Sequence, residues 1–417
     1  MGRNPSSDGQ SGESARPPTT AVLFVDDESA VLDGLRRALR SRGVGWDTGF
    51  ATSGEEALRL LQARPFDVIV SDLRMPEMDG GELLEQVRIS FPGVVRIALS
   101  GCVEREAALR SSGVVHQYLT KPCDPATLVA CIERFCASAH ILPDEAARRV
   151  VGAIGTLPSL PQSAAILMET LHHPGVSFAE VNAIICRDVG MTAKVLQLVN
   201  SPLFPLACEV TSIRSAVILI GLDALKELVF LAEVFRSFEP ACPIEGFCLD
   251  DFEIHAALTA RIAVELPLPG SVLPGVTSAG LLHDIGKLVL AERLPERFEQ
   301  SLALARKQRR PLYSVEPEVI GASHAEIGAY LLGLWGLSPL IVDAVCYHHC
   351  PGQAKCAGTV LSLAGLIHIA DSLANELSPA EASPAPLDLR YLARSGLAGQ
   401  LPVWKAVAQK LAPPPAR

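Results

Sequence analysis

Residues 66–80, which read FDVIVSDLRMPEMDG, place a carboxylate at the end of a buried strand. The run at 68–71 is short and mostly apolar, as in the strands of parallel sheets that are covered on both faces. Pro76 and Gly80 then turn the chain away from the strand direction. Asp72 is therefore expected at the carboxyl end of this strand, which is the edge where open α/β sheets bind their ligands.

The same alternation of a short apolar run and a helix-period segment continues between residues 21 and 137. The apolar runs lie at 21–25, 46–51, 68–71, 96–100 and 116–120, and the helical segments at 30–40, 55–63, 81–89, 104–111 and 125–137. A series of βα units of this length predicts a doubly wound, flavodoxin-like α/β domain with a five-stranded parallel sheet. The ends of its strands then meet at one edge.

Charged and polar residues follow four of these strands. Asp26 and Asp27 end the first strand, Asp72 the third, Ser100 the fourth and Lys121 the fifth. Carboxylates gathered at one edge repel each other unless a cation joins them, and their oxygen atoms suit Mg²⁺. Such a site would bind phosphate, with Asp72 as the nucleophile toward a phosphoryl group. Lys121 and the Ser100 hydroxyl would contact the oxygens of that group.

The strand-end motifs VDDE, SDLRMPEMDG, ALSG and YLTKP resemble the receiver domain of bacterial two-component response regulators. The resemblance covers residues 20–137 and implies that Asp72 is the phosphoacceptor of a sensor histidine kinase. It also implies that Asp27, Asp72 and the backbone carbonyl of Arg74 hold Mg²⁺, with Asp26 beside the metal.

The resemblance also implies a switch in this domain. Ser100 and Tyr118 would form the switch pair, in which the aromatic ring turns inward when the hydroxyl is drawn to the phosphoryl group. The peptide bond between Lys121 and Pro122 would be cis. Phosphorylation would then repack this face of the receiver and control the second half of the chain.

The second half of the chain has a different pattern. After a linker at 138–149, helix-period segments closed by glycine and proline predict an all-α, HD-like domain. These segments lie at 164–171, 178–187, 192–199, 213–220 and 224–235. The phrases LPSLP, AEVNAIICRDVGMTAKVLQLVNSPLF and SIRSAVILIGLDALKELV resemble the HDOD family, the HD-related output domain, over residues 150–375. The polar segment at 1–19 is expected to be a disordered tail and 376–417 a C-terminal extension.

Histidine and aspartate residues recur between residues 255 and 371 in the order H, HD, H, HH, D. LLHDIGK, at 281–287, is expected on one helix, where neighbouring residues point about 100° apart, so that His283 and Asp284 approach one metal from two sides. The other candidate ligands are His255, His324, His348, His349 and Asp371. Imidazoles with carboxylates suit Zn²⁺, Mn²⁺ or Fe²⁺. A shared Asp284 could bridge two such ions, which activate water against phosphorus.

This order of ligands resembles the HD-domain phosphohydrolases, and the resemblance implies two metal sites that share Asp284. One site would use His255, His283, Asp284 and Asp371, and the other Asp284, His324, His348 and His349. Lys287 would contact phosphate. Cyclic-dinucleotide phosphodiesterases of the HD-GYP type carry a Glu and a G-Y-P signature soon after the paired histidines. This chain has Cys-Pro-Gly at 350–352 instead, which argues against that particular substrate.

Charge and cysteine usage exclude several classes of partner. The formal net charge is −10, whereas binding to polyanions draws on clustered lysine and arginine, so neither nucleic acid nor an anionic membrane is an expected partner. The 11 cysteines form no C-x-x-C pair and follow no signal peptide, which favours a reducing cytoplasm. No apolar run is long enough to predict a transmembrane helix.

The sequence therefore predicts a cytoplasmic response regulator whose output domain works mainly through contact with a downstream protein that the sequence does not identify. The alternative is a phosphorylation-gated, metal-dependent HD-type phosphohydrolase that acts on a nucleotide or a cyclic dinucleotide. The oligomeric state stays open, and a homodimer is one of the options.

Overall fold

The computed structural model describes residues 20–100, 114–139, 141–142, 144–152, 154, 158–159, 167, 170, 176–200, 209–221, 236–237, 244–267, 273–354, 361–377 and 384–411. The predicted tail at 1–19 and the predicted helices at 104–111 and 224–235 lie outside these residues. Most of the predicted helix at 164–171 and the end of the C-terminal extension do so too. The side chain of Ser100 is also outside the described set.

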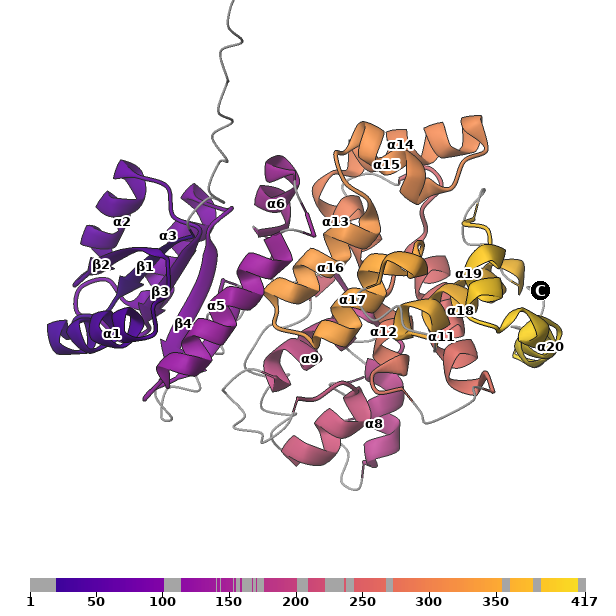
Figure 1. The fold of residues 1–417 in the computed structure, drawn as a ribbon, viewed down its shortest axis with the longest axis horizontal. Helices are drawn as coiled ribbons and strands as arrows, with labels where there is room; N and C mark the ends of the chain where they lie inside the picture. The colour runs from indigo at the N-terminus through magenta and orange to yellow at the C-terminus, as the bar shows by residue number, and fades with distance from the viewer. Residues whose placement is uncertain are drawn as a thin grey trace, which may run out of the picture.

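A five-stranded parallel sheet forms the N-terminal part of the molecule (Figure 1). Its strands are β1 (Ala21–Val25), β2 (Asp47–Ala51), β3 (Val68–Asp72), β4 (Val95–Ser100) and β5 (Gln117–Thr120), in the spatial order β2-β1-β3-β4-β5. The helices described around it are α1 (Ser29–Ser41), α2 (Gly54–Ala63), α3 (Gly80–Ser90) and α5 (Pro125–Ala139). This doubly wound sheet confirms the predicted fold. The strand order reverses between β1 and β3, which is where such sheets bind ligands.

The rest of the described chain is helical, apart from β6 (Pro158–Ser159) and β7 (Arg236–Ser237), which pair in parallel. Its first helices are α6 (Glu145–Gly152), α8 (Phe178–Ile185), α9 (Val189–Val199) and a further helix at 213–221. The central ones are α11 (Leu249–Glu265), α12 (Val276–Leu282), α13 (Ile285–Arg293), α14 (Pro295–Gln308), α15 (Leu312–Val319), α16 (His324–Leu334), α17 (Pro339–Tyr347) and α18 (Leu363–Leu377). The last elements are the short 3-10 turns η1 (Pro351–Gln353) and η2 (Ala398–Gln400), with α19 (Leu389–Arg394) and α20 (Leu401–Lys410).

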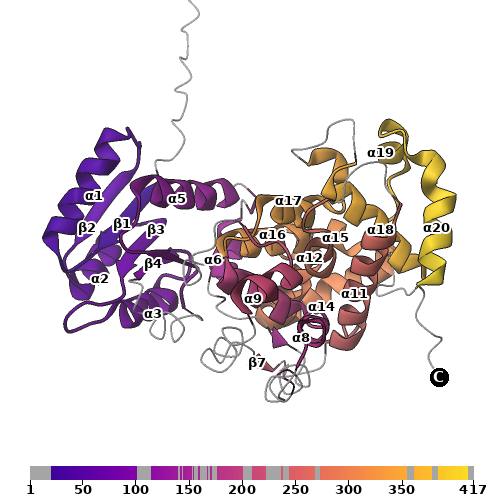
Figure 2. The same cartoon turned by 90° about the horizontal axis from the view of Figure 1, so that it is seen from below.

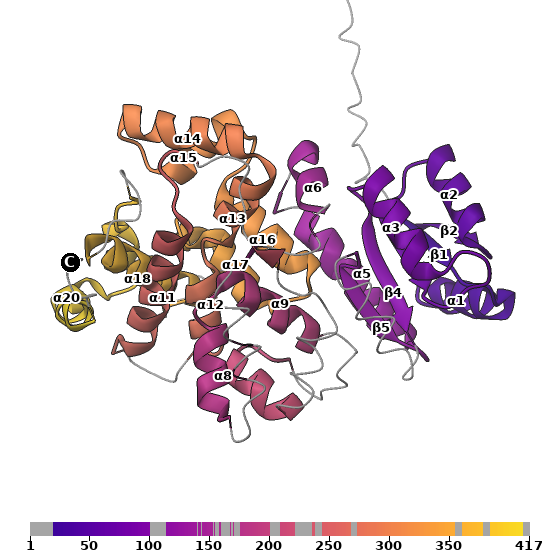
Figure 3. The same ribbon diagram turned by 180° about the vertical axis from the view of Figure 1, so that it is seen from behind.

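Helices α5 and α6 lie between the sheet and the helical bundle, and α19 and α20 lie at the far end (Figures 2 and 3). The linker predicted at 138–149 thus contains the first turn of α6. Trp404 of α20 is fully buried in a cluster with residues of α11 and α18, which fixes the C-terminal extension on the bundle. None of the helices in the described ranges is long and apolar enough to cross a membrane.

One apolar core runs through both halves of the molecule. Successive strand residues point to opposite faces of a sheet. Accordingly Leu23 packs in a layer with α2 and α3, whereas Phe24 packs in a layer with α1 and α5. This second layer continues beyond α5 into the helical bundle, as far as Ile341 and Val345 of α17. The two halves are therefore joined by buried side chains as well as by the chain itself.

Candidate phosphorylation and metal sites

The carboxyl ends of the strands bring two aspartates and a lysine together. The Lys121 amine lies 2.6 Å from Asp26 Oδ2 and 2.9 Å from Asp72 Oδ2. Asp26 is buried, Asp72 is 7% exposed, and Asp27 is exposed beside them. Oxygen atoms of the three carboxylates lie within 4.8 Å of one another. The structure therefore assembles the acidic residues and the lysine that the sequence singled out.

The electrostatics of this edge agree with a bound divalent cation. Burial raises the pKa of the Asp72 carboxyl and the charge of Asp26 adds to this, while Lys121 and the backbone N–H of Arg74 oppose it. Burial acts against the charged amine of Lys121, but hydrogen bonds to Asp26 and Asp72 raise its pKa. Three hard oxygen donors with one amine among them fit Mg²⁺. The predicted magnesium site stays a prediction that the residues present support.

The turn after β3 has room for glycine alone. A Cβ atom on Gly80 would lie 1.9 Å from the carbonyl oxygen of Asp72, so a side chain there would displace Asp72. The peptide bond between Lys121 and Pro122 is cis, which confirms that expectation. Tyr118 is buried in the layer that contains α2 and α3. Its switch role with Ser100 stays a prediction.

All seven predicted histidine and aspartate ligands come together inside the helical bundle. His255 is on α11, Asp371 is on α18, His324 begins α16, and His348 and His349 directly follow α17. Only His349 among the seven is more than slightly exposed. Residues separated by more than 100 positions therefore meet at one buried centre, which we call the histidine centre.

The LLHDIGK segment does not form one helix, contrary to the prediction. Helix α12 ends at Leu282 and α13 begins at Ile285, so His283 and Asp284 lie at the turn between them. The turn redirects α13 toward α16, where an added Cβ on Gly286 would lie 1.9 Å from the His324 carbonyl oxygen. This close approach brings Asp284 to the first residue of α16.

Asp284 occupies the middle of the histidine centre. Its Oδ2 atom is 3.3 Å from His283 Nε2 and 2.6 Å from the Lys287 amine. Its Oδ1 atom is 3.1 Å from His324 Nε2 and 3.6 Å from His348 Nε2. Two ligand groups surround it, one of His324, His348 and His349 with Asp284 itself, the other of His255, His283 and Asp371. The first group equals one of the two sets that the resemblance implies, and the second equals the other set without Asp284.

Hydrogen bonds fix three of the imidazoles with Nε2 turned inward. Nδ1 of His283 donates to the Gly280 carbonyl at 2.8 Å, and Nδ1 of His348 donates to the Val345 carbonyl at 2.7 Å. Nδ1 of His324 donates to Glu316 Oε2 at 2.7 Å. In the described part of the chain, the buried Nε2 atoms of His283 and His348 have no hydrogen-bond partner. Oriented, unpartnered imidazole nitrogens are what a metal ligand set provides.

The ionisation of the centre means that a metal ion would have to displace protons from its imidazoles. Burial would raise the pKa of Asp284, but His283 and Lys287 hold it well below its usual range. Burial acts against a charged His324, whereas Glu316 and Asp284 raise its pKa to about 10. His324 Nε2 nevertheless lies 3.0 Å from His349 Nε2, so a proton or a metal cation has to lie between them. An ionised carboxylate among imidazoles suits Zn²⁺, Mn²⁺ or Fe²⁺.

The sequence did not reveal three residues that support this centre. Glu316 on α15 accepts hydrogen bonds from both the backbone N–H and the ring of His324. Asn375 donates to Asp371 Oδ1 at 2.7 Å, and the ring of Tyr313 stacks on His349 with centroids 4.3 Å apart. The spacing of Asn375, one helical turn after Asp371, was the only local signal for any of them. His368 bonds the His348 carbonyl through Nδ1 at 2.7 Å.

The amino-terminal edge of the sheet is buried against the helical bundle. Arg96 at the start of β4 is fully buried, and its guanidinium donates to the Gly152 carbonyl of α6 at 2.6 Å and the Val114 carbonyl at 2.6 Å. His116 accepts the Arg96 backbone N–H at Nδ1, so its other nitrogen donates to the Gly152 carbonyl at 3.0 Å. Gln197 of α9 donates to the His116 carbonyl. This contact lies at the opposite end of the strands from Asp72.

Two family models match the chain. The response regulator receiver domain matches residues 22–133, and the HDOD domain matches residues 157–351. Both matches cover the regions in which the corresponding sequence motifs lie.

Curated relatives match parts of the chain. An uncharacterized 14.6 kDa protein from the sodA1 3′ region of Leptolyngbya boryana is 38% identical over 120 residues, which are 28% of this chain and 88% of that protein. The transcriptional regulatory protein ZraR of Escherichia coli O157:H7 is 28% identical over 51% of this chain and 46% of its own length. An uncharacterized protein of Treponema pallidum is 24% identical over 49% of this chain and 39% of its own length. The chain thus spans less than half the length of the last two.

Two solved structures are also similar to parts of the chain. The MmoQ response regulator of Methylococcus capsulatus is 21% identical, covers 60% of this chain and 98% of its own, and has a TM-score of 0.47. An HDOD domain protein of unknown function from Geobacter sulfurreducens is 26% identical, covers 64% of this chain and 92% of its own, and has a TM-score of 0.35.

Proposed function

Because this chain is a signal-transduction response regulator that joins a receiver domain to an HDOD domain, we propose that a sensor histidine kinase phosphorylates Asp72. Phosphorylation then controls the HDOD domain, which acts mainly by contact with a downstream protein. The support for this proposal lies in the residues around Asp72 and in the buried contact between the two domains.

The residues at the strand ends can carry out phosphoryl transfer. An oxygen of Asp72 forms a bond to phosphorus while the bond from phosphorus to the donor histidine breaks. Lys121, already 2.9 Å from Asp72 Oδ2, then contacts oxygens of the transferred group. When bound by Asp27, Asp72 and the Arg74 carbonyl, with Asp26 beside it, Mg²⁺ supplies positive charge against those oxygens.

The proposal rests on strand β5, because this strand runs from the residues around Asp72 to the contact with the HDOD domain. Its carboxyl end leads to Lys121 at the phosphoacceptor, and its amino end begins with Gln117, next to the buried His116. A Cβ atom on Gly336, after α16, would lie 2.3 Å from Gln117 Oε1, so the output domain touches this end closely. His116 and Lys121 are separated by roughly 16 Å at the usual rise of a strand. A shift of Lys121 toward a phosphoryl group therefore pulls on a strand that is anchored in the HDOD domain.

Hydrogen–deuterium exchange with and without acetyl phosphate tests this coupling. Phosphorylation is expected to change the exchange of β5 and also that of α6 and the 334–337 turn, because all three meet at the contact. The Asp72→Asn protein, treated in the same way, is the control and should show no change. Unchanged exchange in α6 and the turn of a fully phosphorylated protein would show that the signal does not use this contact.

The same contact predicts a dependence of stability on pH. Burial lowers the pKa of His116 well below 6.5, and the charges of Arg96 and Lys194 add to this, while the bond to the Gly152 carbonyl opposes it. Below about pH 6.5 the unfolded chain takes up a proton at this residue that the folded chain does not, so stability falls with falling pH. The melting temperature of His116→Gln should therefore fall less steeply between about pH 7 and pH 5 than that of the wild type. Equal slopes would contradict this assignment.

A second candidate function is favoured by the inward-facing imidazoles of the histidine centre. We propose as the alternative that the HDOD domain is a metal-dependent phosphohydrolase for a nucleotide or cyclic dinucleotide, gated by phosphorylation of Asp72. The Nε2 atoms of His283 and His348 support it, because they form no hydrogen bond with the described residues and face Asp284 at 3.3 and 3.6 Å. The two ligand groups support it as well. Bound metal would supply an activated water. Hydrolysis of a panel of phosphate esters by metal-loaded protein, with and without acetyl phosphate, tests it.

A further inference from the structure

A cavity of about 280 Å³ opens beside the histidine centre. Helices α11, α13, α14 and α15 and the segment before α11 surround it. Its wall consists of Gly246, Phe247, Cys248, Asp251, Phe252, His255, Asp284, Lys287, Phe298, Leu302 and Leu312. Neither domain match assigns a function to most of these residues. They connect the buried histidine centre with the surface.

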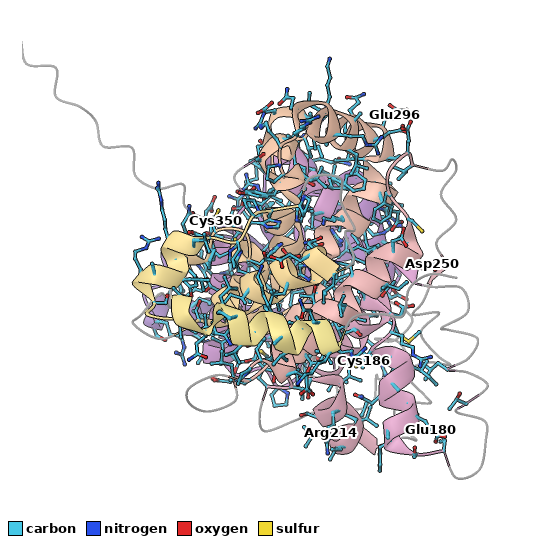
Figure 4. All side chains as sticks on the ribbon, turned by 90° about the vertical axis from the view of Figure 1, so that its right-hand side faces the viewer. Glu180, Cys186, Arg214, Asp250, Glu296 and Cys350 are labelled. Carbon is cyan, nitrogen blue, oxygen red and sulfur yellow. The ribbon has the colours of Figure 1, made fainter. Side chains whose placement is uncertain are left out.

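The cavity has two polar ends. At the inner end lie Asp284, His255 and the amine of Lys287, which is almost completely buried. Asp251 lines the cavity from the first turn of α11 and is exposed, so it lies at the mouth. Figure 4 shows its neighbour Asp250 on the same side of the molecule as Glu296, in the first turn of α14. Carboxylates therefore lie on this side of the mouth, where the Arg306 guanidinium also lies beside Gly246, whereas the inner end holds Lys287 paired with Asp284.

Aromatic side chains form the wall between these ends. The ring of Phe247 lies edge-on to that of Phe298, with centroids 5.4 Å apart, and tilted to that of Phe252, with centroids 6.0 Å apart. Leu302 and Leu312 complete the apolar surface. Aromatic walls of this kind bind flat rings, by stacked or edge-on contact and by removing apolar surface from water.

We propose that this cavity binds a phosphate monoester that carries one flat ring and a hydroxyl or amino group. The phosphate lies toward Lys287 and the histidine centre, the ring lies on the phenylalanine wall, and the hydroxyl or amino group donates a hydrogen bond to Asp251. The inference deepens the second candidate function and rests on the same centre, but it concerns binding and requires no turnover.

Size and charge separate this ligand from larger ones. The volume of the cavity lies just below the range of roughly 300–1,000 Å³ that is typical of sites for drug-sized ligands. It therefore has room for one nucleotide-sized molecule. A cyclic dinucleotide would place its second phosphate outside Lys287, toward the mouth, where the charge of Asp251 repels it. The cavity thus favours the mononucleotide over the cyclic dinucleotide.

Calorimetric titration of the full chain tests the proposal, with adenosine monophosphate, the other nucleoside monophosphates and phenyl phosphate as probes. We expect at least one nucleoside monophosphate to bind about tenfold or more tightly than the matching nucleoside, inorganic phosphate or a cyclic dinucleotide. The nucleoside lacks the phosphate, inorganic phosphate lacks the ring, and the cyclic dinucleotide carries a second phosphate. Binding by none of the probes, or equal binding by ester and nucleoside, would overturn it.

Two variants of one helix show where the ligand binds. Leu302→Trp places a larger side chain in the cavity and should weaken binding about tenfold or more. Leu304→Trp, also on α14 but not in the cavity wall, is the matched control and should bind as the wild type does. Equal affinities in the two variants would place the ligand elsewhere. Metal content is measured on the same samples. A protein that lacks metal but still binds the ligand would contradict the proposed hydrolysis and leave the ligand site standing. A metal-loaded protein that binds no probe would contradict the ligand site and leave the proposed hydrolysis standing.

Discussion

Asp72→Asn is expected to abolish phosphorylation of the chain completely. The amide has nearly the shape of the carboxylate, but it is neutral and cannot attack phosphorus. Lys121 keeps its contact with Asp26 at 2.6 Å, so the edge of the sheet should stay folded. Incubation with acetyl phosphate, followed by intact-protein mass spectrometry or separation on phosphate-affinity gels, measures the effect.

Asp67 offers a matched control at the other end of the same strand. It directly precedes β3, and its carboxylate accepts a hydrogen bond from the Ala21 backbone N–H, away from the acidic edge. Asp67→Asn should be phosphorylated as the wild type is. A phosphoryl group on the Asp72→Asn protein would show that another residue is the acceptor and would remove the basis of the proposed control of the HDOD domain.

Asp284→Asn should lose the transition metal of the histidine centre. Asp284 belongs to one ligand group and approaches the other, since its two oxygens lie 3.3 Å from His283 Nε2 and 3.1 Å from His324 Nε2. One substitution therefore weakens both groups. Elemental analysis of protein purified without chelator or a histidine tag measures the loss, and thermal denaturation shows whether the variant is folded.

The partly exposed His349 separates loss of metal from loss of structure. His349→Gln changes one ligand group only, at a site where the side chain is less buried, and should remove part of the bound metal from a folded protein. His116→Gln lies at the domain contact and should keep all of it. A wild-type protein that holds no metal, even after incubation with Zn²⁺, Mn²⁺ or Fe²⁺, would show that the phosphohydrolase alternative is wrong and leave a phosphorylation-controlled binding protein.

The order of residues along the chain predicted well which side chains the structure brings together, because both clusters are built from the ends or faces of regular elements. Asp26, Asp72 and Lys121 follow short apolar runs, and parallel strands bring such positions to one edge. The histidine ligands were recognisable from their order. Helix boundaries near the histidine centre were harder to predict. The turn at His283 and Asp284 depends on the close contact of Gly286 with α16, and no local sequence signal indicates this contact.

The sequence also did not predict the partners of the buried polar groups. Glu316 orients His324 from a helix that carries no motif, and its pairing exists only once α15 packs on α16. Arg96 and His116 gave no signal as a domain contact either. An arginine is ordinarily exposed, and burial of this one depends on the carbonyl groups of Gly152 in α6 and of Val114 before β5. Such pairings belong to the tertiary structure and are not encoded by periodicity.

The buried arginine at the start of β4 also restricts how this protein can have evolved. A different receiver domain would bring its own residues to the positions of Arg96 and His116. The carbonyl group of Gly152 would then stay buried without these two donors, at a cost of about 1–3 kcal/mol, and the apolar layer that continues into α17 would lose part of its packing. At this contact the receiver and the HDOD domain have therefore to change together.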